Sequence, residues 1–285
     1  MFPLHYIQSM GDFMIKKPAM ELVAIPDQLP LWSQDFRGLP NALARSALFG
    51  VAHLRKGVRK DFKRAELAST QGIRLVYTGE ELRQDDEDVF LQVLHLAKEQ
   101  QLGEDIRFTA NSMIVALGWS RNSESYERLS VCMNRMKATA LVLTVDRPGG
   151  GSMSFTGSLL GEFGWREKGS DDPMREWVVS LEKNIVKLFD PDAYSLLNWK
   201  TRMDLPPLAK WLHSFYSTHK VPFPHKVETL HKLTASETKE LRMFRSKLKI
   251  ALALLVERGF FLSATIDPKS DLVNVERAAD RKRLE

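Results

Sequence analysis

Cysteine is almost absent, since the 285-residue chain contains only Cys132. A single cysteine excludes an internal disulfide framework and is typical of proteins from a reducing compartment. No apolar run approaches the roughly 20 residues that a membrane-spanning helix needs. The first residues also lack the basic and apolar regions of a signal peptide. We therefore expect a soluble cytoplasmic protein that makes no contact with a membrane.

Signatures of catalysis are lacking as well. The glycines from Gly149 to Gly151 are not followed by the Gly-Lys-Ser/Thr of a phosphate loop, and a hairpin tip explains them better. Four histidines between positions 213 and 231 recur every six residues, a spacing that does not place them on one helical face. The acidic run from Asp85 to Asp88 is interpreted as the first turn of a helix, where the dipole favours negative charge. We expect no enzyme, no cofactor and no metal site.

Positive charge is in excess. The formal net charge is +5 and the sequence pI is about 9.2, while the hydrophobic content of 44% is ordinary for a globular protein. A basic chain favours acidic partners such as nucleic acid. The length suits two domains of ordinary size or one large domain.

The strongest pattern lies between residues 237 and 261. Apolar residues recur there at three- and four-residue steps and predict the buried face of a long helix starting near Ser236; they are Leu241, Phe244, Leu248, Ala251, Leu252 and Leu255. Residues 226–258 hold eight Lys or Arg against four Glu. We interpret the other face as DNA-binding, with base contacts from Thr238, Lys239 and Arg242, and phosphate contacts from Arg245, Ser246 and Lys249. The alternative is an amphipathic helix whose lysines only aid solubility.

The order of predicted elements repeats along the chain. After a helix at residues 41–54 and a strand at 72–79 come a helix from 85, a short helix within 107–119 that Thr109 caps, a helix from 122 and a hairpin from 141 to 160. A similar order follows Leu205. Helix, turn, helix and hairpin is the order of a winged helix, so we predict an α+β, mainly helical fold of two tandem winged-helix domains with β-hairpin wings. The predicted boundaries are an extended arm (1–37), a first domain (38–190), a linker (191–204) and a second domain (205–285).

The helix from residue 122 has a less clear role. Four of its polar residues are predicted to face DNA phosphates, namely Arg121, Ser125, Arg128 and Arg135. Glu124 and Glu127 weaken the positive field, so a solvated face is an equal alternative. The hairpin strands at 141–160 also offer an edge for self-association.

Several segments resemble the TrfA family of plasmid replication initiators. The resemblance runs from about residue 29 onward and is carried by LPLW (29–32), RGLPN with RSALFG (37–50), VYTGEELRQDDEDVF (76–90), RFTANSMIVALG (107–118), PLAKWLHSFYSTH (207–219) and KVETLHKLTAS with the following helix (226–258).

This resemblance implies a protein that binds repeated double-stranded sites (iterons) at a plasmid origin. It implies opening of the adjacent DNA, with contacts to single-stranded origin DNA, and recruitment of the host helicase and initiator. It also implies a homodimer in equilibrium with monomer, dimerisation or backbone contact by the first domain, and sequence reading by the second.

Residues Gln28, Leu29, Leu31 and Trp32 resemble the short peptide by which bacterial replication proteins dock on the sliding clamp. Trp32 stands where phenylalanine is usual, and Pro30 interrupts the motif. The alternative is that these side chains cover the core of the first domain.

The sequence is also compatible with two other functions. A transcriptional repressor could be built from the same two modules, and plasmid maintenance would separate it from an initiator. A nuclease would belong to another class and would nick or cut supercoiled plasmid in the presence of magnesium.

Overall fold

The computed structural model describes residues 28–52, 58–101, 103–147, 149–166, 176–190 and 192–278. The predicted arm as far as residue 27 and the basic C-terminal residues 279–285 lie outside the described part. Strands accompany helices throughout, so the fold is mixed α/β rather than mainly helical. No helix among the described residues is both long and apolar enough to cross a bilayer.

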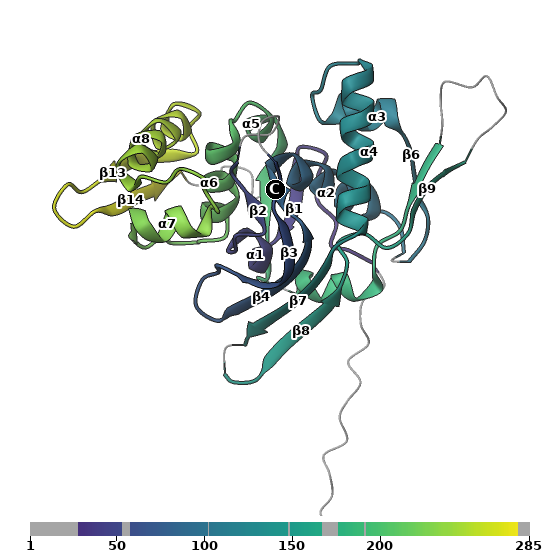
Figure 1. Ribbon diagram of the computed structural model, residues 1–285, viewed down its shortest axis with the longest axis horizontal. Coiled ribbons are helices and arrows are strands. Elements are labelled where there is room, and N and C mark those ends of the chain that lie inside the picture. Colours follow the sequence, from purple (N-terminus) through teal and green to yellow (C-terminus); the bar gives the residue numbers. More distant parts are fainter. Residues whose placement is uncertain are drawn as a thin grey trace, which may run out of the picture.

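Buried apolar residues form two clusters. One extends from Leu29 to Trp199 and the other from Leu205 to Val273. We call the residues around these clusters the first unit and the second unit. Figure 1 shows α8 of the second unit and α4 of the first on opposite sides of the molecule along its long axis, with β9 lying beyond α4.

Helix α2 (Gln84–Ala97) is the centre of the first unit. Its predicted buried face, which includes Phe90 and Leu94, lies in the core, but its acidic first turn is buried too. It packs against α4 (Ser123–Lys137) and against β1 (Phe36–Pro40). Strand β1 pairs antiparallel with β11 (Tyr194–Asn198).

A four-stranded antiparallel sheet flanks this centre in the order β3-β4-β7-β8. The strands are β3 (Asp61–Leu67), β4 (Ile73–Glu80), β7 (Ala140–Asp146) and β8 (Ser152–Gly157). Strand β4 confirms the predicted strand at residues 72–79. The predicted hairpin at 141–160 is confirmed, because β7 pairs antiparallel with β8, with Leu143 opposite Phe155. Its other edge pairs with β4, with Leu75 opposite Leu143, so the hairpin is part of this larger sheet.

The order helix, strand, helix, helix, strand, strand occurs twice. In the first unit α2 is followed by β6 (Ile106–Thr109), α3 (Ala110–Ala116), α4, β9 (Phe163–Arg166) and β10 (Glu176–Val179), with the β7–β8 hairpin inserted after α4. The second unit has α6 (Pro207–Ser217), β12 (His225–Lys226), α7 (Val227–Leu233), α8 (Leu241–Glu257), β13 (Phe261–Ile266) and β14 (Leu272–Arg277). In each unit the last strand lies between the other two, in the orders β6-β10-β9 and β12-β14-β13. The two units therefore share a topology.

Local signals explain where several helices begin and end. Thr109 caps α3 by accepting a hydrogen bond from the Ser112 amide, and Asn122 caps α4 through the Ser125 amide. Gly118 follows α3 with φ of 66°, a left-handed conformation that glycine adopts without strain. Pro207 opens α6, where its missing N–H has no cost.

Three other predictions need correction. The helix predicted from residue 41 ends after one turn, because α1 (Asn41–Ala44) is followed by β2 (Phe49–Gly50), which pairs in parallel with β5 (Leu82–Arg83). The segment predicted as a linker holds β11 and α5 (Trp199–Met203), and Leu197 is buried in the first core. The long helix starts at Leu241 rather than near Ser236.

Candidate nucleic-acid interface

Helix α8 has one buried face and one exposed face. Phe244, Leu248, Ala251, Leu252 and Leu255 enter the core as predicted. Arg242, Ser246 and Lys249 are exposed and lie on one row, at steps of four and three residues. Within the described part of the chain neither Arg242 nor Lys249 forms an ion pair, whereas Arg245 and Arg258 do, so this row presents positive charge to solvent.

The loop before α8 carries the two remaining base-reading candidates. Lys239 is exposed in this loop. Thr238 is held inside the second unit instead: its carbonyl lies 2.8 Å from His231 Nε2, and its hydroxyl accepts a hydrogen bond of 2.9 Å from Lys247 Nζ. Thr238 therefore shapes the loop, while Lys239 is the candidate for contact.

Arg245 differs from its neighbours because it is paired. Its guanidinium donates two hydrogen bonds to the Asp271 carboxylate, at 2.8 and 2.7 Å. These bonds hold the pKa of Asp271 below its usual value. Asp271 lies in the β13–β14 turn with a positive φ of 56°. The pair fastens the hairpin to α8, so Arg245 is a positioning residue and not the free phosphate contact that the sequence predicts.

The predicted DNA face of α4 is largely engaged inside the first unit. Arg121 is exposed, but Ser125 is buried. Arg128 stacks on the Trp119 ring at 4.0 Å and lies 3.3 Å from Asp85. Arg135 is buried and lies 2.6 Å from Asp86. The prediction for Ser125, Arg128 and Arg135 is therefore corrected, because internal carboxylates and packing occupy these side chains.

The acidic run at the start of α2 explains this arrangement. Asp85 and Asp86 are buried and face Arg59 and Arg135, with Arg59 Nη1 2.7 Å from Asp86 Oδ2. Burial raises the pKa of Asp86, and Asp85 beside it acts in the same direction, while the arginines oppose them. The helix dipole alone, which the sequence suggests as the reason for the acidic run, does not explain why these carboxylates are buried against arginines. That interpretation is therefore incomplete.

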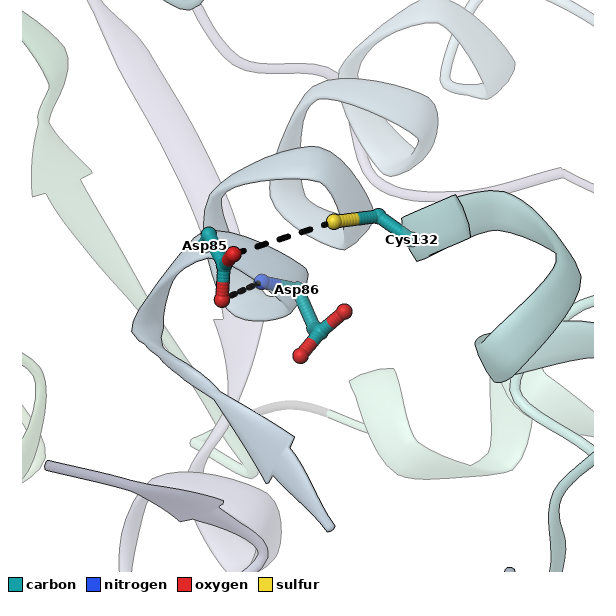
Figure 2. A group of neighbouring side chains, drawn as sticks. All are labelled: Asp85, Asp86 and Cys132. Carbon is teal, nitrogen blue, oxygen red and sulfur yellow. Dashed lines mark hydrogen bonds between the residues drawn. The ribbon is translucent and has the colours of Figure 1, made fainter. Parts of the chain in front are cut away.

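Asp85, Asp86 and Cys132 lie close enough together to be considered as ligands for an ion (Figure 2). The carboxylates are already neutralised by three arginines, Arg59 before β3 and Arg128 and Arg135 on α4. Burial raises the pKa of the Cys132 thiol well above its ordinary value, which opposes the thiolate that a metal requires. The chemistry of these three side chains therefore suits pairing with arginine better than binding a metal ion.

The second half of the acidic run connects the two units. Arg202 of α5 is fully buried and donates to Asp88 Oδ1 at 2.7 Å and to Ser214 Oγ at 2.7 Å. Ser214 donates in turn to Glu87 Oε1 at 2.9 Å. Lys210 Nζ of α6 also pairs with Asp88. Sequence reasoning missed this network, although four acids within an otherwise apolar helix signal that not all of them can reach solvent.

The predicted clamp-binding peptide is part of the first core. Leu29 and Trp32 are buried, and Trp32 stacks on Phe189 with ring centroids 6.1 Å apart. The Trp32 indole donates to His95 Nδ1 at 3.1 Å. The Gln28 side chain donates to the Lys98 carbonyl, and of the three apolar residues Leu31, which is 70% exposed, remains at the surface. The clamp prediction is corrected, because two of its three apolar anchors are unavailable.

Comparison with known proteins shows which family this chain resembles. The TrfA protein family matches residues 14–277. The plasmid replication initiator protein TrfA of Escherichia coli is 31% identical over 247 residues, which is 86% of this chain and 63% of the relative. The chain thus spans less than two thirds of that protein's length.

The solved structures give a likeness of fold. Two crystal structures of domains 2 and 3 of RctB align with TM-scores of 0.55 and 0.54, each at 15% identity over 84% of this chain. The alignments cover 98% and 97% of those chains, so nearly all of the two RctB domains has a counterpart here. With the family match extending over both units, the chain belongs to the TrfA family.

Proposed function

We propose that this protein initiates plasmid replication by binding repeated double-stranded sites at the origin through α8 of the second unit. The observation that carries the proposal is the exposed row of Arg242, Ser246 and Lys249 on a helix held by a hairpin. Family membership and the name of the Escherichia coli relative support it.

Both units are proposed to be winged helices. Their shared order of helices and strands, with the last strand in the middle of a three-stranded sheet, supports this. In such a fold the second helix of the helix-turn-helix enters the major groove, which is α8 in the second unit and α4 in the first. Because internal acids engage Arg128 and Arg135, sequence reading is assigned to α8, and α4 is left with backbone contact through Arg121.

Arg242 is proposed to read guanine, since its planar guanidinium matches the two acceptors on the major-groove edge. Lys239 and Lys249 are proposed to contact phosphates. The protein is further proposed to act without catalysis in the bacterial cytoplasm, to exchange between dimer and monomer, to open the adjacent DNA and to recruit the host helicase and initiator. Opening would bring it into contact with single-stranded origin DNA.

Footprinting of the purified chain on its own plasmid's origin tests the central claim. Evenly spaced protection that Arg242→Ala weakens is the expected result, and the absence of any protected repeat would refute the proposal. Arg74→Ala is the matched control, because Arg74 is an exposed arginine on β4 of the first unit.

Two further assays separate the proposal from other functions. A plasmid that carries the gene and its repeats should be maintained, whereas a repressor would bind the repeats without maintaining it. Supercoiled plasmid should remain uncut in the presence of magnesium, whereas a nuclease would nick it.

A further inference from the structure

The exposed face of α8 also carries apolar side chains. Met243 is 49% exposed and Ile250 is 71% exposed. They lie on one row with Lys247 between them, at steps of four and three residues, next to the row of Arg242, Ser246 and Lys249. A single exposed apolar residue is ordinary, but here two lie on the surface that the proposed function places in the groove.

Cations flank this apolar pair on both sides. Around the helix, Arg242 and Lys249 come first, Ser246 next, then Met243 with Ile250, and finally Lys247. A major groove has the same order in cross-section, with a phosphate wall, a floor of base edges and a second phosphate wall. The apolar pair therefore falls where base edges would lie, and Lys249 and Lys247 fall where phosphates would lie. Arg242, beside the pair, keeps its proposed contact with a neighbouring guanine.

The apolar feature of a major-groove floor is the C5-methyl group of thymine. Seven residues of α-helix rise by about 10.5 Å, and base steps are about 3.4 Å apart, so Met243 and Ile250 are separated by about three base steps. We infer that these two side chains contact thymine methyl groups, and that the bound repeat has thymines about three steps apart at these positions. This inference rests on the proposed function and names the bases that α8 selects.

The same side chains border a hollow of about 620 Å³ between α8 and the residues Pro206, Pro207 and Leu208. A protein segment in this hollow would also use Met243 and Ile250. Removal of a methyl group from DNA affects only the first kind of contact, so it distinguishes the two.

The probe is a duplex selected from a random pool by the full-length chain. Each thymine of the selected duplex is then replaced by deoxyuridine, which lacks only the methyl group. Loss of a contact worth one buried CH₂ weakens binding about fourfold, equivalent to about 0.8 kcal/mol. Two sensitive thymines about three steps apart are expected for the parent.

Variants assign each methyl group to a side chain. In Ile250→Ala one of the two sensitive positions should become insensitive to deoxyuridine, and in Met243→Ala the other. Val221→Ala is the matched control, because Val221 is an exposed apolar residue in the loop before β12, and it should keep both sensitivities. All three side chains are exposed, so circular dichroism spectra should match that of the parent.

The outcomes are separable. If every thymine can be replaced without effect, or if both variants keep both sensitivities, the inference is overturned while the proposed function stands. If Ile250→Ala loses plasmid maintenance and its duplex affinity is unchanged, a protein partner occupies this surface and the inference is overturned. If no sequence is enriched from the pool, the proposed function itself fails.

Discussion

Removal of the Arg202 side chain should strongly destabilise the protein. Arg202 is fully buried between the two units, where it neutralises Glu87 and Asp88. Arg202→Ala leaves Lys210 to pair with Asp88, but Glu87 keeps only its hydrogen bonds to neutral groups. The contact with Glu87 is chiefly Coulombic: Nη2 lies 3.1 Å from Oε2, which accepts no hydrogen bond with proper geometry.

The expected loss is large compared with the stability of an ordinary domain. Breaking a buried ion pair by removing one partner costs about 3–5 kcal/mol, whereas a whole domain is stable by only about 5–15 kcal/mol. Urea unfolding followed by tryptophan fluorescence and circular dichroism measures this loss. Arg258→Ala is the matched control, since its pair with Asp204 at 3.4 Å is about half exposed and should contribute less than about 1 kcal/mol.

The pH dependence makes the test more specific. Burial already raises the pKa of Glu87, and Arg202 opposes that rise. Without Arg202 the pKa of Glu87 rises further, so the variant regains stability when this carboxyl is protonated at low pH and loses it as pH rises through the folded-state pKa. The difference between Arg202→Ala and the parent should therefore be larger at pH 8 than at pH 5. A loss below about 1 kcal/mol that is equal at both pH values would refute the reasoning.

If Arg202→Ala does not fold, Arg202→Lys provides the measurement. Lysine keeps the charge but cannot donate to Asp88 and Ser214 with one planar group, so an intermediate loss is expected. A variant as stable as the parent would mean that the hydrogen-bond geometry around Arg202 contributes nothing.

Three further predictions concern binding and acid stability. Arg242→Ala should weaken binding to the selected duplex by about 1–3 kcal/mol and leave the circular dichroism spectrum unchanged, as measured by titration against the Arg74→Ala control. Lys249→Ala should weaken binding to every sequence and reduce the slope of log K against log salt by about 0.9, measured between 50 and 200 mM salt. Burial lowers the pKa of His213 to about 3, so the folded protein keeps this histidine neutral while the unfolded chain protonates near pH 6.5. Stability should therefore fall by about 2 kcal/mol between pH 7.5 and pH 5 on account of this residue, and His213→Leu should lack that share of the loss.

Each of these three results has an outcome that contradicts it. Unfolding of Arg242→Ala would mean that the side chain supports the fold. An unchanged salt slope for Lys249→Ala would remove the phosphate contact. An identical acid dependence for His213→Leu and the parent would mean that His213 is solvated.

Local sequence predicted the periodic parts of the fold. The apolar stripe from Leu241 to Leu255 fixes which face of α8 is buried, because one helical period is enough to determine it. The start of α8 was misplaced by five residues, because Thr238 and its neighbours form a loop held by His231 and Lys247 from outside that stripe. Helix ends depend on such contacts more than on the repeating pattern.

Long-range pairing was the part that could not be predicted. Nothing local to residues 141–160 specifies that β7 pairs with β4 rather than β6, since both partners offer similar alternation. The same holds for the candidate site. Arg135 and Arg242 are both basic residues on amphipathic helices, and only the position of Asp86, which lies 49 residues before Arg135, removes one of them from the surface.

Translation releases Glu87 and Asp88 of α2 long before their counter-ions Arg202 and Lys210. Arg202 follows Asp88 by 114 residues and Lys210 follows it by 122. At about 5–20 residues per second the nascent chain carries these unpaired carboxylates for about 6–23 s. A fragment that stops at residue 198 should for this reason stay protease-sensitive where the whole chain resists, and a resistant fragment would show that the first unit matures alone. The first unit is thus expected to complete its folding only after α6 has been synthesised.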